Sequence, residues 1–175
     1  NNQKMKNSYL HILALALIAS VFAQSEKIRI SVLEFENNIT SPSKDEADAA
    51  KLLRDEIEHL VYQAGRFDVI SSTERKRILD EQKYQSKSGC VDESCAVEIG
   101  QMLGAEKMIV GSVGKLGSIY RMSAKMLDIE TGAIERSGSY DTRNNIENLL
   151  INGTSDIVEE LIGASYQNRI GAEQS

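Results

Sequence analysis

Three successive β-strand patterns, separated by two tight turns, constrain the fold of this chain most strongly. The strands are expected at 107–116, 119–130 and 133–143, with turns at Gly117-Ser118 and Thr131-Gly132. A Thr-Gly pair suits a tight hairpin, because one residue of such a turn takes a positive φ that glycine adopts without steric cost. Strands joined by turns this short pair antiparallel. The second half of the chain is therefore predicted to be an antiparallel meander.

Patterns on either side of the meander predict helices and two further strands. Ser43 and Glu46 form a capping-box pattern at the start of the first helix, and Ser72 or Thr73 is expected to cap the second. Strand patterns lie at 27–35 and 66–71, and helix patterns lie at 44–64, 73–84, 95–103 and 145–162. The order β-α-β-α-α-β-β-β-α predicts a single-domain α/β fold, a mixed-sheet sandwich in which a helix links two parallel strands.

The N-terminal 23 residues read as an export signal preceded by a few upstream residues. Lys6 is followed by the apolar stretch LHILALALIASVF and then by Ala23, after which cleavage is expected. An uncleaved membrane anchor is the alternative, although an apolar core of roughly a dozen residues is short for a span of about 20. No cysteine stands at the cleavage point, so the sequence predicts an exported protein that is not a lipoprotein.

The charge of the chain argues against two classes of partner. The formal net charge is −6, and loss of Lys4 and Lys6 with the leader makes it −8. An acidic chain with 5% aromatic residues lacks the basic surface that nucleic acids and anionic membranes require. Nucleic acid and membrane surfaces are therefore not expected as partners.

Catalytic and cofactor motifs do not emerge from the sequence. The pair Gly114-Lys115 imitates the end of a P-loop, but Ile109 stands where that loop needs glycine and Leu116 where it needs serine or threonine. His59 adjoins the apolar stripe of its helix and is expected at the solvated surface. The sequence thus predicts a protein that is not an enzyme, with no cofactor and no metal site.

Cys90 and Cys95 are the only cysteines in the chain. In an oxidising compartment such a pair is expected to form a disulfide, and closing so small a loop would stabilise the fold by about 2 kcal/mol. A metal site or a redox pair is the alternative, but the four intervening residues differ from the two-residue spacing of zinc knuckles and thioredoxin motifs.

Two charged segments are candidate interaction sites. The first is the basic run Arg75, Lys76 and Arg77 on the second helix, and the second is the loop around Asp92 and Glu93. An ordinary exposed helix with local ion pairs is the alternative interpretation of the basic run.

The segments that carry a family resemblance are SVLEFENN at 31–38, GRFDVISSTERKRILDEQ at 65–82, and SGCVDESCAVEIGQMLGAEKMIVGSVGKLG at 88–117, followed by DIETGAI at 128–134. Together they resemble the bacterial CsgG-type cell-envelope domain superfamily, which is similar to the LpoB-like activators of penicillin-binding proteins and to the N-terminal domain of TolB.

The resemblance covers about 28–162. One domain is therefore expected at 24–166, and the polar residues at 167–175 are expected to form a tail. The resemblance implies a non-enzymatic periplasmic assembly or scaffold protein that binds other envelope proteins, self-associates, and associates peripherally with the outer membrane. Activation of a peptidoglycan synthase or of another envelope enzyme is the alternative function. Binding of a small molecule or a glycan is a third.

Overall fold

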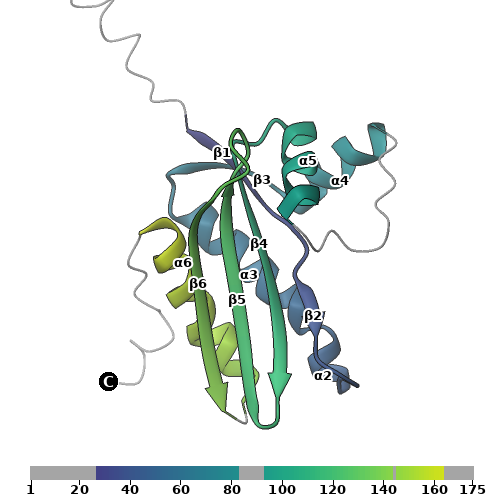
Figure 1. Ribbon diagram of the computed structural model, residues 1–175, viewed down its shortest axis with the longest axis vertical. Helices are drawn as coiled ribbons and strands as arrows, with labels where there is room; N and C mark the ends of the chain where they lie inside the picture. The colour runs from purple at the N-terminus through teal and green to yellow at the C-terminus, as the bar shows by residue number, and fades with distance from the viewer. Residues whose placement is uncertain (1–26, 83–92, 144, 164–175) are drawn as a thin grey trace, which may run out of the picture.

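The predicted meander forms the larger part of a six-stranded mixed sheet (Figure 1). A computed structural model describes residues 27–82, 93–143 and 145–163, so the leader predicted at 1–23 and the tail predicted at 167–175 lie outside these ranges. The strands are β1 (Ile28–Val32), β2 (Glu36–Asn38), β3 (Phe67–Ile70), β4 (Lys107–Leu116), β5 (Ile119–Asp128) and β6 (Ile134–Arg143).

The strands are ordered β3-β1-β4-β5-β6, and β2 pairs with β4 beyond the end of β1. Strand β1 runs parallel to β3 and β4, whereas β4, β5 and β6 pair antiparallel. The helices are α2 (Lys44–Ala47), α3 (Ala49–Gln63), α4 (Ser72–Glu81), α5 (Glu93–Leu103) and α6 (Thr154–Ile162), with a π-helix, η1 (Leu149–Gly153), before α6. The predicted mixed-sheet α/β fold is confirmed.

Local signals set most of the element ends. The Ser43–Glu46 capping box is present, and the glycines in the two meander turns, Gly117 and Gly132, have φ of 60° and 71°. Helix α4 is capped by Ser71, whose hydroxyl accepts from the Glu74 amide at 3.2 Å. The predicted cap at Ser72 or Thr73 was therefore wrong by one or two residues.

Two elements differ from the sequence prediction. The strand expected at 27–35 ends at Val32, and β2, which was not predicted, begins at Glu36 beyond the expected bounds. The first helix splits into α2 and α3 at Asp48. Within the described ranges no helix has the length and apolar character needed to cross a membrane.

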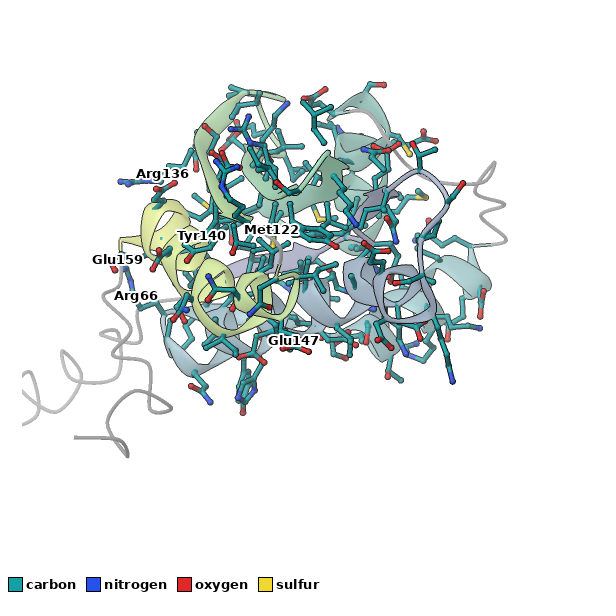
Figure 2. All side chains as sticks on the ribbon, turned by 90° about the horizontal axis from the view of Figure 1, so that it is seen from below. Arg66, Met122, Arg136, Tyr140, Glu147 and Glu159 are labelled. Atoms are coloured by element: carbon teal, nitrogen blue, oxygen red, sulfur yellow. The ribbon has the colours of Figure 1, made fainter. Side chains whose placement is uncertain are left out.

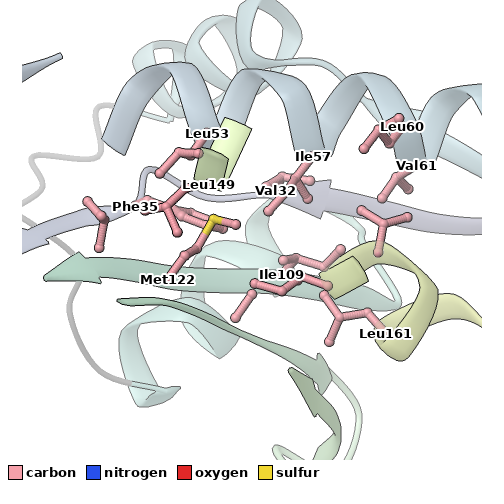
Figure 3. Close-up of a cluster of buried hydrophobic side chains, with 14 of the residues drawn as sticks. Val32, Phe35, Leu53, Ile57, Leu60, Val61, Ile109, Met122, Leu149 and Leu161 are labelled. Carbon is pink, nitrogen blue, oxygen red and sulfur yellow. The ribbon is translucent and has the colours of Figure 1, made fainter. Parts of the chain in front are cut away.

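Helices pack on both faces of the sheet, but they cover the two faces unequally. Helices α3 and α6 lie with η1 along one face. In the view from below, the side chains of Met122 and Tyr140 point toward this helical layer (Figure 2). Figure 3 shows Val32, Phe35 and Ile109 of the sheet side facing Leu53 and Ile57 of α3 in this larger core. Helices α4 and α5 build a smaller core on the other face, around Ile70, Met108 and Leu127. The far halves of β4, β5 and β6 are therefore covered on one face only.

Candidate functional site: an open sheet face

One face of β2 and of the far halves of β4, β5 and β6 is left uncovered by the described helices (Figure 1). Successive side chains of a strand point to opposite faces, and directly paired residues of neighbouring strands share a face. Asn37 and Val113 lie on the side of α2 and α3, since Asn37 donates to the Glu46 carbonyl and Val113 belongs to the larger core. The uncovered residues, which we call the open sheet face, are Glu36, Asn38, Ser112, Gly114, Arg121, Ser123, Lys125, Ser137, Ser139 and Asp141.

Short side chains dominate the middle of the open sheet face. Ser112 on β4 pairs with Ser123 on β5, which pairs with Ser139 on β6. Gly114 lies on the same face, between Asn38 and Arg121, and glycine within a strand often marks a place where another backbone approaches closely. The middle of this face is thus flat and shaped for contact with another surface.

Strand β6 ends the sheet beside this face. None of its ten residues is fully buried, and no described strand pairs with its outer side. An edge strand of this length offers backbone donors and acceptors to an additional strand. Its charged residues, Glu135, Arg136, Asp141 and Arg143, oppose indiscriminate pairing.

Fixed charges frame the open sheet face. Arg121 donates through Nε and Nη2 to the two carboxylate oxygens of Asp141, each at 2.6 Å. This paired contact holds the pKa of Asp141 below its usual range and raises the pKa of Arg121. Lys125 Nζ lies 2.7 Å from Glu93 Oε1 at the start of α5. These contacts hold the charges in place at two sides of the serine rows.

A hollow of about 210 Å³ lies where the open sheet face meets α5. Glu34, Glu36, Glu93 and Lys125 line it together with Ser112 and Ser123. Of its three carboxylates, Glu93 pairs with Lys125 and Glu34 pairs with two arginines, so Glu36 is the lining carboxylate without an ion pair among the described contacts.

Glu34 is held in the wall of that hollow by two buried arginines from different helices. Arg54 Nη2 donates to Glu34 Oε2 at 3.1 Å, and Arg75 Nη2 donates to Glu34 Oε1 at 2.9 Å. Arg75 Nη1 also donates to Ser31 Oγ at 3.2 Å. Both arginines are 4% exposed, whereas the Glu34 side chain is 66% exposed. Helices α3 and α4 therefore fix a solvent-facing carboxylate beside the sheet.

The structure corrects one of the sequence-predicted interaction residues. Arg75 is not on a solvated face, because it shares the inner side of α4 with Ile78 and Leu79, three and four residues further on, which pack on the smaller core. That spacing was visible in the sequence. Lys76 and Arg77 are exposed and pair with Asp80 and Glu81 on the same helix, as the alternative interpretation of the basic run predicted.

Arg54 on α3 is also buried, and its guanidinium pairs with Glu34 and Glu58. The partners lie 20 positions away or on the same helix, so periodicity alone favoured solvent. His59 is exposed, as predicted.

The second predicted interaction segment is the loop around Asp92 and Glu93. Glu93 lines the hollow beside the open sheet face, while Asp92 lies outside the described residues. Cys90 also lies outside them, and Cys95 is half-buried in the first turn of α5. The Cys90–Cys95 disulfide stays a prediction.

A metal site and a free acid–base pair at the second hollow are not supported by the described residues. No group of three or more His, Cys, Asp or Glu side chains in the described ranges could hold a metal ion. A second hollow, of about 530 Å³, includes Lys107 and Asp128, but their side chains pair with each other at 2.6 Å. Asp128 also accepts from Thr131 in the hairpin turn. Lys107 and Thr131 together hold the pKa of Asp128 well below its usual range.

Comparison with known proteins identifies a family for this chain and solved structures with a similar fold. Residues 29–162 match the family DUF3280, described as "Protein of unknown function (DUF2380)", and no curated protein matches the sequence. The fold is similar to the LpoB C-terminal domain from Salmonella enterica (16% identity, 71% of this chain and 90% of that chain, TM-score 0.53). It is also similar to the LpoB C-terminal domain from Escherichia coli (18% identity, 71% of this chain and 92% of that chain, TM-score 0.52). A third similar structure is lipoprotein GNA1162 from Neisseria meningitidis (15% identity, 83% of this chain and 89% of that chain, TM-score 0.52). At these identities the likeness concerns the fold, so the predicted LpoB-like fold is confirmed. The relationship to the CsgG type and to TolB stays a prediction.

Proposed function

Because this chain belongs to the DUF3280 family, for which no activity is described, we propose a function from its fold and its surface: a non-enzymatic envelope protein that binds another envelope protein through the open sheet face. The fold shared with the LpoB C-terminal domain and a neisserial lipoprotein supports the envelope setting. The proposal retains the export leader at 1–23, the domain at 24–166, the tail at 167–175, and a periplasmic location without a lipid anchor.

The observation that carries this proposal is the flat serine-lined face beside an edge strand with no described neighbour. We infer that the occupant is an extended segment of the partner, which adds beside β6 and lies over Ser123 and Ser139. Strand addition gives affinity through backbone hydrogen bonds and specificity through side-chain contacts. A basic residue in that segment would complement the carboxylate of Glu36 at the hollow.

Site-specific photo-crosslinking in envelope extracts tests the proposal. A photoreactive side chain at Ser139, in the centre of the face, should give a discrete adduct that the companion substitution Ser123→Arg removes. The same side chain at Glu159, which is exposed on α6, should not give that adduct. Adducts of equal yield from both positions, or none from Ser139, would refute the proposed face. An adduct between two copies of this chain would show that the face mediates self-association in place of partner binding.

Activation of an envelope enzyme is the second candidate function, favoured by the fold shared with the LpoB C-terminal domain. It predicts that the purified protein raises the rate of a peptidoglycan synthase and that Ser139→Arg removes the increase. An unchanged rate with a synthase that nonetheless crosslinks at Ser139 would favour the scaffold role.

A further inference from the structure

We propose that a groove on the helical layer binds a short amphipathic segment of a partner protein, apolar on one side and rich in lysine or arginine at its margins. The groove has a volume of about 260 Å³ and lies between the first half of α3 and the residues that lead into η1. Helix α3 and η1 cover the sheet face opposite the open sheet face. In the view from below, Glu147 of this groove points away from the core that Met122 and Tyr140 enter (Figure 2). The proposal therefore concerns a second surface and goes beyond the proposed function.

The floor and walls of the groove are apolar. Ala49 and Leu53 are buried at its base, and Ile146 is half-buried beside them. Leu52 is 52% exposed and Leu150 is 37% exposed on its walls. Exposed apolar residues that stand singly need no explanation, whereas a group of them with a polar rim marks an interaction site.

The position of Leu150 depends on the π-helical turn. Residues Leu149–Gly153 form this turn, in which Leu149 is fully buried and Leu150 faces the groove. A Cβ on Gly153 would lie 2.9 Å from the Tyr140 ring, so glycine lets η1 pack closely on the sheet. Isolated π-helical turns often occur at functional sites.

The size of the groove distinguishes between ligand classes. Pockets for drug-sized ligands have volumes of roughly 300–1,000 Å³, and this groove is smaller. It suits a few apolar side chains that project from one side of a helix, as in complexes where an amphipathic helix lies in a groove.

The rim of the groove determines the charge of the segment. Asp45, Asp48 and Glu147 stand around the apolar floor with Lys44, so three carboxylates face one ammonium group. Among the contacts of the described residues, none of these three carboxylates takes part in a side-chain hydrogen bond or ion pair. By contrast, neighbouring Glu46 binds Lys115 and Tyr120. Unpaired carboxylates favour a basic segment and disfavour an acidic one.

A designed peptide provides the test. The probe is a fluorescent helix with leucine at i, i+3, i+4 and i+7 and lysine elsewhere, and the control has glutamate in place of every lysine. Fluorescence anisotropy with the full chain should show saturable binding of the lysine peptide only. Leu52→Ser should weaken that binding about tenfold, since one buried leucine anchor is lost. Tyr62→Ser, at a residue of the same helix that is 69% exposed and outside the groove, should leave it unchanged.

Salt dependence tests the rim separately. In the triple variant Asp45→Asn, Asp48→Asn, Glu147→Gln, binding of the lysine peptide should lose most of its dependence on ionic strength. Equal binding of both peptides, or binding unaffected by Leu52→Ser, would overturn the proposal. Self-association of the wild type that Leu52→Ser abolishes would also overturn it, because the occupant would then be a second copy. The variant Ser139→Arg should bind the peptide normally, so failure of this proposal is distinguishable from failure of the proposed function.

Discussion

Replacement of Arg75 by alanine should destabilise the protein far more than replacement of its neighbours Lys76 and Arg77. The Arg75 guanidinium is buried and donates to Ser31 and Glu34. A hydrogen bond from a charged group contributes about 1.5–3 kcal/mol, and breaking a buried ion pair costs about 3–5 kcal/mol. Glu34 is largely exposed and keeps Arg54 as a partner, so water and Arg54 recover part of the loss. We therefore expect a decrease of about 3 kcal/mol in the free energy of unfolding.

Urea unfolding of the purified variants, followed by circular dichroism and extrapolated linearly to water, measures this difference. Lys76→Ala and Arg77→Ala remove exposed pairs between residues four positions apart and should each cost about 0.3–0.5 kcal/mol. A double-mutant cycle that combines Arg75→Ala with Glu34→Gln should give a coupling free energy of about 1–2 kcal/mol. If Arg75→Ala costs no more than Lys76→Ala, the side chain is solvated and the arginine pair does not fix Glu34 at the hollow.

Three further predictions address packing, pH and the cysteines. Gly111→Ala should lower the free energy of unfolding by about 1–3 kcal/mol, because the added Cβ would lie 2.4 Å from the Phe35 ring. Gly114→Ala is the matched control, since its Cβ would lie 3.8 Å from the nearest atom, Asn38 Cβ. Equal losses in the two variants would contradict this packing. Lys115, Tyr120 and Ser43 hold the pKa of Glu46 well below its ordinary value of 4.5, so the stabilisation from Glu46 is complete above about pH 4.5 and is lost as pH falls further. Urea unfolding between pH 3 and 7 should show a smaller acid loss in Glu46→Gln, and an identical loss would refute this role. If Cys90 and Cys95 form a disulfide, the intact mass of the native protein should be lower than that of the reduced protein by two hydrogen atoms. Two cysteines that both react with a thiol reagent in the native protein would exclude the disulfide.

Features of the fold that depend on residues close together in the sequence could be predicted from the sequence, whereas features that depend on distant residues could not. The meander was predictable because its signals are local: alternating side chains, and glycines at Gly117 and Gly132 where the backbone needs positive φ. The capping box at Ser43 and the ends of α5 and α6 at Gly104 and Gly163 have the same character. Each depends on residues within one turn of one another.

Features that join distant segments were not predictable in the same way. Arg75 contacts Ser31 and Glu34 across 44 and 41 positions, and no local pattern encodes that contact. The sequence also gave no sign that α4 and α5 cover only part of their sheet face, since coverage depends on where helices dock and not on their periodicity.

The sequence by itself determined the mixed α/β class and the antiparallel meander, and it contains no recognisable catalytic motif. The export leader at the N-terminus stays a prediction. The sequence also pointed to Glu93, although it placed that residue in a loop without neighbours. The tertiary structure alone decided that serines from three strands form one open face, that two buried arginines hold Glu34 beside it, and that Leu52 and Leu150 meet in one groove. Local backbone preferences act within a few residues, whereas a surface is made of residues that only the packing of the whole domain brings together.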